Sequence, residues 1–316
     1  MNPGYGPAIS VTGLNKSYGE HIVLESLDFE VAEGSVYALL GPNGAGKTTT
    51  VQILSTLTKP DGGEIGVGGY DPVTQADEVR SVIGVTGQFS AVDELLTGRE
   101  NLLLMGDLHH LPRAESRRIA EDLLEKFDLV EAANKVASGY SGGMTRRLDL
   151  AMTLVGSPRI IFLDEPTVGL DPRSRRAMWD IIRDLVAGGV TIFLTTQYLE
   201  EADQLADRIA VLHGGRIVAE GTADQLKRMV PGGYIKLDFA DRTGLDAAAR
   251  VFGEAAQVNG DLTLAIPSDG GVRSVREVLD RLDAARVEPE GLSVHTPDLD
   301  DVFLALTGAP EQETSR

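Results

Sequence analysis

One segment of the sequence has the residue types and spacing that bind phosphate groups. It runs Gly41-Pro42-Asn43-Gly44-Ala45-Gly46-Lys47-Thr48 and matches the pattern G-x-x-x-x-G-K-[ST]. Its glycines allow backbone conformations in which successive N–H groups point inward, Lys47 brings a full positive charge, and the Thr48 hydroxyl can ligate Mg²⁺. An apolar run, Val36–Leu40, precedes the segment, and residues 49–56 are expected to form a helix. This strand, loop and helix context predicts a nucleotide-phosphate site rather than a chance glycine turn.

Two further places in the sequence carry groups suited to the same chemistry. Residues 160–163 are apolar and run into Asp164-Glu165, which predicts a buried parallel strand that ends in two carboxylates. The carboxyl edge of such a sheet is where α/β proteins bind ligands. Gln88 follows an expected strand over residues 82–86, and its amide oxygen could reach Mg²⁺ and an attacking water. Taken alone, Gln88 would be an ordinary surface residue.

Other candidates have two interpretations each. Ser141-Gly142-Gly143-Met144 precedes an expected helix over residues 145–155, so it is either an anion site or a plain N-cap; the short spacing to Asp164 favours the anion site. Tyr18 could stack on a purine, or be a strand-end tyrosine. His109-His110 predicts no metal site, because adjacent helical residues point about 100° apart. A solvated helix end is expected there.

Composition limits the classes of function. The net charge is −19, from 29 basic and 48 acidic residues, which argues against non-specific binding of nucleic acid or anionic lipid. There is no cysteine, so disulfide and thiol chemistry are excluded and a reducing cytosol is permitted. The N-terminus lacks a basic-then-apolar signal pattern, and no apolar run is long enough to span a bilayer. We expect no direct membrane insertion, so any membrane function would need a partner.

The element pattern predicts two domains, residues 1–230 and 231–307, followed by a disordered tail over 308–316. The first is an α/β domain with a helical segment over about 91–157, and Trp179 is expected in its core. The second has the order βαββαβ, which suggests a small ferredoxin-like α+β unit. Its last helix, residues 299–306, carries Val302, Phe303 and Leu306. These three either form a dimer contact or close the small domain's own core.

The motifs, taken together, resemble a known family. The phosphate loop, Gln88, Ser141-Gly142-Gly143, Asp164-Glu165 and Leu170-Asp171 stand in the order found in the nucleotide-binding subunits of ATP-binding-cassette (ABC) transporters, over residues 9–229. The chain also resembles the daunorubicin-resistance type of exporter ATPase from actinomycetes, at residues 86–88, 140–144, 195–198 and 299–304. That extends the likeness to almost the whole chain. The resemblance implies a RecA-like core, a helical subdomain and the cofactors ATP and Mg²⁺.

The resemblance also implies roles for matching residues. Tyr18 would stack on adenine, residues Gly41 to Thr49 would hold the phosphates, Thr48, Gln88 and Asp164 would approach Mg²⁺, and Glu165 would polarise the attacking water. Ser141, Gly142, Gly143 and Met144 would cap the γ-phosphate of ATP bound to the other subunit of a homodimer, with Asp171 at the dimer seam. A second helix N-terminus arriving from the partner would complete the compensation of transition-state charge.

The sequence departs from the family pattern at three positions. Tyr140 and Met144 stand where the signature usually has Leu and Gln, but the Ser-Gly-Gly core is intact, so we expect the dimer to form. Gln197 replaces the usual switch histidine. Glutamine can donate and accept hydrogen bonds but cannot ionise near neutral pH. We therefore expect slow hydrolysis, driven by Glu165 with Gln197 as an auxiliary, and no step in the pH profile that belongs to position 197.

The resemblance implies a motor subunit that couples ATP-dependent dimer closure to a separate membrane permease, docked around residues 90–97, on the cytoplasmic side of the cell membrane. A ribosomal ATPase would normally carry two cassettes, and a chromosomal one a long coiled coil, for which there is no room. A GTPase should carry Asn-Lys-x-Asp, and residues 15–18 and 134–137 both lack the Asp. An importer ATPase would usually have a barrel-like extra domain. Antibiotic or xenobiotic drug export follows from resemblance alone, and lipid export would leave the same motifs.

Overall fold

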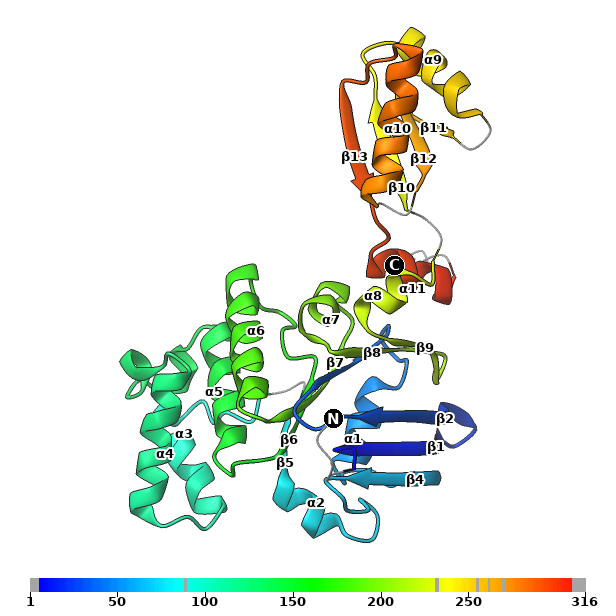
Figure 1. Cartoon of the computed structure of the whole chain (residues 1–316). Helices are drawn as coiled ribbons and strands as arrows, with labels where there is room; N and C mark the ends of the chain where they lie inside the picture. The colour runs from blue at the N-terminus through cyan, green and yellow to red at the C-terminus, as the bar shows by residue number, and fades with distance from the viewer. Residues whose placement is uncertain are drawn as a thin grey trace, which may run out of the picture. The chain divides into compact units, whose positions relative to one another are not determined.

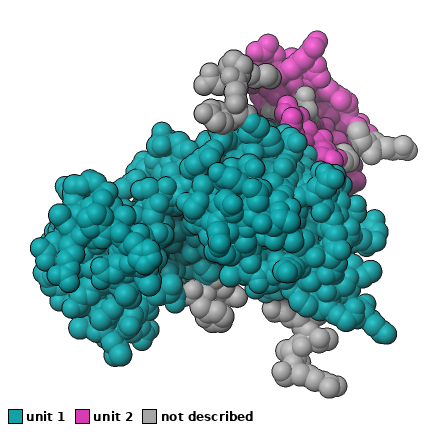
Figure 2. Space-filling model, turned by 90° about the horizontal axis from the view of Figure 1, so that it is seen from below, with its two compact units in different colours: residues 1–223 teal, residues 224–316 magenta. Residues whose placement is uncertain are grey.

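The chain divides into two compact units, residues 1–223 and 224–316 (Figures 1 and 2). A computed structural model describes residues 6–87, 90–230, 233–253, 256–260, 262–268 and 271–308. The predicted residue Gln88, part of the predicted boundary at 231–233 and the predicted tail from 309 onward lie outside the described residues. The division at 223/224 comes a few residues before the expected boundary, so a short helix that the sequence placed in the first domain, α8 (Ala223–Lys227), falls almost wholly in unit 2.

The larger sheet of unit 1 positions the candidate site. Its strand order is β5-β6-β7-β3-β8-β9, and all neighbours are parallel except β8 and β9. Every residue of β3, β6 and β7 is buried, as expected for central parallel strands covered on both faces. The strands span β3 (Val36–Leu40), β5 (Ile83–Thr86), β6 (Ile160–Asp164), β7 (Thr191–Thr196), β8 (Arg208–His213) and β9 (Arg216–Gly221).

A second sheet of unit 1 is antiparallel and has the order β2-β1-β4. Its strands span β1 (Ile9–Tyr18), β2 (His21–Val31) and β4 (Gly62–Val67). The main core cluster lies between the two sheets and includes helix α1 (Lys47–Leu54). Within it, the rings of Tyr37, Phe29 and Phe193 pack against one another, and Tyr37 stacks on Phe29 and on Phe193 with ring centroids 5.4 Å and 5.6 Å away. Burial of these large rings fixes β3, the strand that leads into the phosphate loop.

Helices α6 and α7 contact strands of the larger sheet, and α3, α4 and α5 pack together as a helical group (Figure 1). Across the described residues, no helix combines the length and apolar character that crossing a bilayer requires. The remaining helices of unit 1 span α2 (Ala76–Val82), α3 (Gly98–Leu108), α4 (Arg113–Lys126), α5 (Gly142–Leu154), α6 (Pro172–Ala187) and α7 (Leu199–Leu205), with short 3₁₀ turns η1 (Val130–Ala132) and η2 (Ala137–Gly139).

The start of α3 is fixed by its own side chains and by a close neighbour. Thr97 and Glu100 form a reciprocal capping box, which satisfies two backbone N–H groups at the helix start. Gly98, the first residue of α3, packs against Tyr140: a Cβ added at Gly98 would lie 2.2 Å from the tyrosine hydroxyl oxygen. That hydroxyl donates a hydrogen bond to Ala132 O at 2.8 Å. The residue that precedes Ser141 is thus tied to the helical group.

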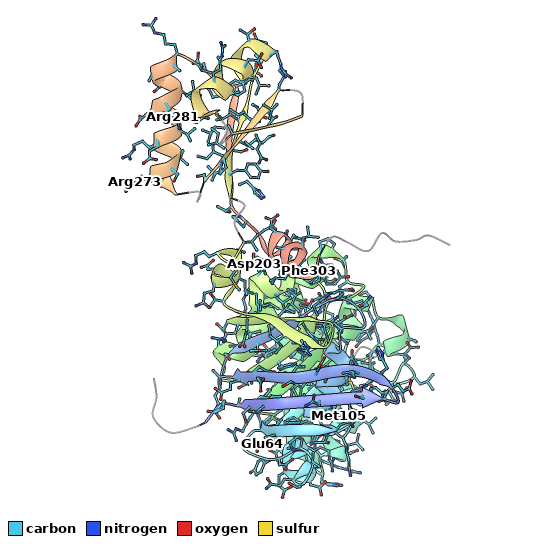
Figure 3. The ribbon with its side chains drawn as sticks, turned by 90° about the vertical axis from the view of Figure 1, so that its right-hand side faces the viewer. Glu64, Met105, Asp203, Arg273, Arg281 and Phe303 are labelled. Carbon is cyan, nitrogen blue, oxygen red and sulfur yellow. The ribbon has the colours of Figure 1, made fainter. Side chains whose placement is uncertain are left out.

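Unit 2 is a four-stranded antiparallel sheet with the order β11-β12-β10-β13, and its chain order βαββαβ is that expected of a ferredoxin-like unit. Its core cluster joins β10 and β12 to α9 and α10. Arg281 of α10 lies over the ring of Phe252, 4.6 Å from its centroid, and donates to Val251 O, which ties the two helices together (Figure 3). The elements span β10 (Tyr234–Asp238), α9 (Arg242–Phe252), β11 (Gln257–Asn259), β12 (Thr263–Pro267), α10 (Val272–Ala285), β13 (Gly291–His295) and α11 (Leu299–Thr307).

Several sequence expectations on element bounds were wrong. α1 begins at Lys47 rather than at residue 49, because Gly46 is its N-cap and the helix starts directly from the loop. A strand expected over residues 64–69 corresponds to β4, which begins at Gly62 and ends at Val67, since Gly68 and Gly69 adopt positive φ angles of 62° and 90° and form a turn. The short helices α2 and α7 were not expected. Val302 is buried, yet no residue of α11 belongs to the core cluster of unit 2 as described.

Candidate functional site

The carboxyl ends of neighbouring parallel strands bring the predicted groups to one edge of the larger sheet. β3 leads into the phosphate loop, β6 ends at Asp164, and β7 ends one residue before Gln197. Strand register places Asp164 beside Thr195 and Leu40 beside Thr196. The sheet therefore brings the phosphate loop next to two groups that lie more than a hundred residues further along the chain.

The phosphate loop depends on Gly46 and closes around Lys47. Gly46 has φ 109°, and a Cβ there would lie 2.5 Å from Leu24 Cδ2, so a larger residue would meet both backbone strain and a clash. The Lys47 side chain is buried, and its ammonium donates to Gly41 O at 2.8 Å and Pro42 O at 3.0 Å. The ammonium is thereby held inside the loop that precedes it.

A cavity of about 410 Å³ opens beside this loop. Lys47 Nζ lies 3.2 Å from Glu165 Oε1, so the cation predicted to bind phosphate and the carboxylate predicted to polarise water face the same space. Gly41, Pro42 and Ala45 are not among its lining residues; they form the backbone turn behind it, where Ala45 N donates to Pro42 O. The cavity is lined by Val23, Asn43, Gly44, Gly46, Lys47, Thr48, Thr49 and Glu165.

Asp164 and Glu165 are held by the neighbouring strand. The Thr195 hydroxyl donates to Asp164 Oδ1, and the Glu165 N–H donates to Thr195 O at 3.1 Å. Glu165 has φ 51°, a left-handed conformation that is uncommon for residues other than glycine. Such strain persists only where the surrounding contacts enforce it. The carboxylate is therefore aimed by backbone constraints on both sides of its residue.

Arg146 supplies the other constraint, and sequence reasoning missed its role. Its guanidinium donates to Gly87 O at 2.8 Å, Pro166 O at 2.9 Å and Asp164 O at 3.2 Å, and it forms an ion pair with Asp149 at 3.2 Å. Burial lowers the pKa of Arg146 and raises that of Asp149, and the attraction between the two charges offsets both shifts in part. The sequence showed an arginine near a helix start, but nothing local pointed to these distant carbonyls.

Glu201 was also missed. It is fully buried, and its Oε1 accepts from the Thr167 hydroxyl at 2.8 Å and from the Trp179 indole N–H at 3.2 Å. Trp179 is in the core, as predicted. Burial raises the pKa of Glu201, while hydrogen bonds from Thr196, Thr167 and Trp179 lower it in part. This carboxyl joins the loop after β6 to helices α6 and α7.

Two helix starts that the sequence singled out lie side by side. Ser141 is the N-cap of α5 and accepts from Met144 N at 3.3 Å, so the N-cap interpretation holds geometrically. Asp171 is the N-cap of α6, and its bonds from Ser174 hold the pKa of its carboxyl below the usual value. A Cβ on Gly143 would lie 2.6 Å from Ser174 Oγ, which shows how closely the two starts approach.

Several other predicted residues also do not line the cavity around Lys47. Tyr18 ends β1 with half of its surface exposed, and the Lys16 ammonium lies 5.1 Å from its ring centroid. Gln197 follows β7 and is half-buried. Ser141 and its neighbours belong to the separate pair of helix starts. His109 and His110 are exposed, as expected, and no group of three or more His, Asp or Glu side chains in the described part of the chain is placed to hold a metal.

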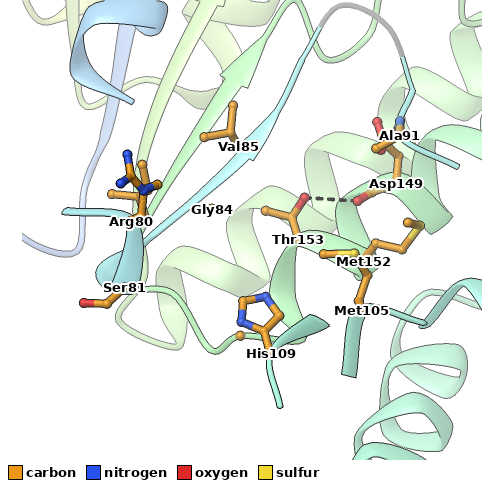
Figure 4. Close-up of a pocket in the computed structure, with 12 residues that line it drawn as sticks. Arg80, Ser81, Gly84, Val85, Ala91, Met105, His109, Asp149, Met152 and Thr153 are labelled. Atoms are coloured by element: carbon orange, nitrogen blue, oxygen red, sulfur yellow. Dashed lines mark hydrogen bonds between the residues drawn. The ribbon is translucent and has the colours of Figure 1, made fainter. Parts of the chain in front are cut away.

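A second cavity of unit 1, of about 250 Å³, lies among β5, α3 and α5 (Figure 4). Met105 and Met152 give it an apolar lining, and His109 lies at its edge beside Gly156. Asp149 closes one end: its Oδ1 accepts from Ala91 N at 3.0 Å and its carbonyl accepts from the Thr153 hydroxyl at 3.1 Å. This hollow adjoins the segment at 90–97 that the sequence singled out.

Comparison with known proteins identifies the family. The pattern of the family described as "ABC transporter" matches residues 24–168. The chain is 49% identical to the daunorubicin resistance ATP-binding protein DrrA3 of Streptomyces coeruleorubidus, over 95% of this chain and 96% of the relative. It is 45% identical to the doxorubicin resistance ATP-binding protein DrrA of Mycobacterium tuberculosis, over 96% and 95%, and 38% identical to the Nod factor export ATP-binding protein I of Rhizobium leguminosarum bv. viciae, over 95% of each.

Solved structures show the same fold. An ATP-binding subunit of an ABC transporter superposes with a TM-score of 0.63 at 31% identity, covering 70% of this chain and 92% of that one. The fold and the relatives over nearly the full length agree with the order of motifs in the sequence. The chain belongs to the ATP-binding subunits of ABC transporters, in the group that contains the daunorubicin resistance ATP-binding proteins.

Proposed function

We propose that this chain is the ATP-hydrolysing motor of an exporter, acting as a homodimer on a separate membrane permease at the cytoplasmic face of the cell membrane. The observation that carries the proposal is the cavity in which Lys47 and Glu165 face each other across 3.2 Å. A buried cation at a helix start suits the β- and γ-phosphates of ATP, and a carboxylate next to it suits the activation of water. Tyr18, half exposed at the end of β1, would stack on adenine.

The residues present fit Mg²⁺ as the accompanying ion. Thr48 lines the cavity and Asp164 precedes Glu165, and both offer the oxygen donors that Mg²⁺ prefers. One oxygen of Asp164 accepts from Thr195, which fixes the carboxylate plane. Gln88, a further proposed ligand, lies outside the described residues. When bound, Mg²⁺ neutralises charge that develops on the phosphates.

Glu165 is assigned as the general base. Its carboxylate would accept a hydrogen bond from the attacking water, and Lys47 would stabilise the negative charge of the transferred phosphoryl group. Gln197 is placed one residue beyond β7, where its amide could donate to the same phosphate. Because glutamine does not titrate, the rate would follow the ionisation of other groups.

The second half of each ATP site would come from the partner subunit. Residues 141–144 and Asp171 occupy neighbouring helix starts that stand apart from the cavity around Lys47, which supports a role towards a second copy of the chain. Two copies related by a two-fold axis would place each Ser141-Gly142-Gly143 start on the partner's γ-phosphate. Charge in the transition state would then be compensated from both sides.

The cavity among β5, α3 and α5 is the proposed permease site (Figure 4). Its methionine lining adapts to varied apolar side chains, and its position beside residues 90–97 links it to the segment that follows β5. The proposed cargo is hydrophobic and drug-like, because relatives named for daunorubicin and doxorubicin resistance share 44–49% identity with the chain. A Nod-factor-like cargo is the second candidate, favoured by the relatives named for Nod factor export, and lipid export would leave the same motifs.

The test is steady-state ATPase activity of wild type beside Glu165→Gln, with size-exclusion chromatography in the presence of ATP. Glutamine keeps the shape of the side chain and removes the charge, so turnover should fall about 10²–10⁴-fold. The variant should still dimerise with ATP. Glu125→Gln, an exposed position on α4, is the matched control for loss of one carboxylate and should behave as wild type. If wild type binds ATP but does not hydrolyse it even with its permease present, the motor function is refuted.

A further inference from the structure

The guanidinium of Arg146 donates hydrogen bonds to backbone carbonyls at the ends of two strands of the larger sheet. It donates to the carbonyl after β5, at Gly87, and to consecutive carbonyls at the end of β6, at Asp164, Glu165 and Pro166. An arginine has five N–H donors in a fixed planar fork, so one side chain can hold several acceptors in a set geometry. Among the described residues, no other side chain donates hydrogen bonds to as many carbonyls of this edge.

These bonds bear directly on the conformation of Glu165. Its φ of 51° is strained, and its backbone is held on one side by Thr195, through the Glu165 N–H, and on the other by Arg146, through the Glu165 carbonyl at 3.4 Å and the Pro166 carbonyl at 2.9 Å. Without Arg146, one side of this clamp is lost. The carboxylate would then relax away from the position in which it faces Lys47.

Arg146 also lies on the helix whose start is proposed to contact the partner's ATP. Ser141 is the N-cap of α5, and Arg146 follows within the first two turns of the same helix. A helix is a stiff connection over this length. A displacement of the N-terminus of α5 at Ser141 would therefore be transmitted to the backbone of Glu165 through one side chain, that of Arg146.

We propose that Arg146 is a positioning residue for Glu165, and that it links the water-activating carboxylate of one ATP site to the helix start that faces the other site in the dimer. The link between the two sites rests on the proposed function, because it requires the homodimer. The positioning of Glu165 rests only on contacts within one chain. ATP seated against residues 141–144 would thus favour the active conformation of Glu165 in the neighbouring site.

The test uses the full-length chain with Arg146→Met, Arg146→Lys and the matched control Arg147→Met. Arg147 is the next residue of α5 and also bonds carbonyls, but those of Phe127 and Asp128 after α4, so it controls for loss of a partly buried arginine. We expect Arg146→Met to lower kcat about 10²-fold, the order of loss that a misplaced catalytic group causes. KM and the Kd for ATP should stay unchanged, Arg146→Lys should recover part of kcat, and Arg147→Met should match wild type.

A double variant shows whether Arg146 acts through Glu165. In a Glu165→Gln background, Arg146→Met should cause no further loss of turnover, since the group it positions is gone. Because Arg146→Met leaves Asp149 buried without its cation, Arg146→Met/Asp149→Asn is made alongside, and thermal melting checks that each variant folds. If Arg146→Met lowers turnover in the Glu165→Gln background by the same factor as in wild type, the inference is overturned. It is also overturned if Arg147→Met lowers kcat as much as Arg146→Met does.

Amide hydrogen exchange gives a readout that does not depend on turnover. Residues 165–168 should exchange faster in Arg146→Met than in wild type and Arg147→Met. If wild type has no ATPase activity, the proposed function fails while this comparison still decides whether Arg146 holds the backbone of Glu165. Unchanged exchange over residues 165–168 would overturn the positioning role.

Discussion

The two units of the chain differ in the kind of side chain they bury. Unit 1 buries polar and charged groups along with its apolar core, among them Lys47, Asp149, Asp164 and Glu201. Among the described residues of 224–316, every side chain classed as buried is apolar. Burial of a polar group costs free energy unless a partner satisfies it, so each such group needs a reason to be there.

For three of these groups in unit 1, the reason is the chemistry at the sheet edge. Lys47 is satisfied by loop carbonyls, Asp164 by Thr195, and Glu201 by Thr167 and Trp179. All lie at or just beyond the carboxyl ends of parallel strands, where the candidate site is built. Unit 2 has no comparable buried network among its described residues, so its contribution is sought in packing and assembly.

The largest effect is expected from a substitution that leaves a cavity in the core of unit 2, and it tests this contrast directly. Leu237 is fully buried in β10 opposite Leu264, and Leu237→Ala should lower the free energy of unfolding of unit 2 by about 2–5 kcal/mol. Urea unfolding would show this loss, and ATPase activity should be unchanged. Leu292→Ala is the matched control, because Leu292 lies opposite Leu237 on β13 but is 37% exposed, so its loss should be smaller. Loss of ATPase activity with Leu237→Ala would break the contrast.

The second effect concerns the cost of buried polarity in unit 1. Burial raises the pKa of Glu201, so the folded state binds this proton more tightly than the unfolded state does. The free energy that this tighter proton binding adds to folding is fully present below the pKa of Glu201 in the unfolded state. It is lost as pH rises through the raised pKa of the folded state. Relative to Glu201→Gln, wild type should therefore lose stability as pH increases from about 5 to 8. Asp149, whose pKa is also raised, is present in both proteins and cancels in the difference.

Glu201→Ala separates the charge from the hydrogen bonds. It leaves the Thr167 hydroxyl and the Trp179 indole without their acceptor, which should cost about 1–3 kcal/mol across the pH range. Urea unfolding of the three proteins between pH 5 and 8 measures both effects. A difference between wild type and Glu201→Gln that does not vary with pH would show that burial does not perturb this carboxyl.

The smallest effect is expected at Gln197, a polar residue at the same edge that is only half-buried. Wild type should show no step in its pH–rate profile that belongs to this position, since glutamine does not ionise near neutral pH. Gln197→His should change the rate modestly and add a step near the ordinary histidine pKa of about 6.5. The measurement is steady-state ATPase activity from pH 5.5 to 8.5. If rate and profile are both unchanged, position 197 has no switch role.

The features that could be predicted from the sequence were those with a local signal. The buried strands β3 and β6 were predicted from their apolar runs. The phosphate loop was predicted from its glycines and lysine between a strand and a helix. The parallel sheet then explains why Lys47 and Glu165 meet. The family resemblance added the order of the motifs and is confirmed by relatives over nearly the full length.

The features that could not be predicted depend on partners far away in the chain. Arg146 bonds the carbonyl of Gly87, 59 residues away, and Glu201 accepts from Thr167, 34 residues away. Neither contact leaves a trace in local composition or periodicity, because both need the sheet to be assembled first. The start of α1 was missed for a smaller reason: a glycine with positive φ can serve as N-cap without a side-chain bond.

The contact between Gly98 and Tyr140 bears on how this sequence can change. With only 2.2 Å between a Cβ at position 98 and the tyrosine hydroxyl, any larger residue at 98 requires a smaller one at 140, and a smaller residue at 140 empties space that only a larger one at 98 can fill. The two positions are therefore epistatic, and single substitutions at either should be selected against. The unusual tyrosine that precedes Ser141 therefore constrains position 98, 42 residues earlier, to glycine.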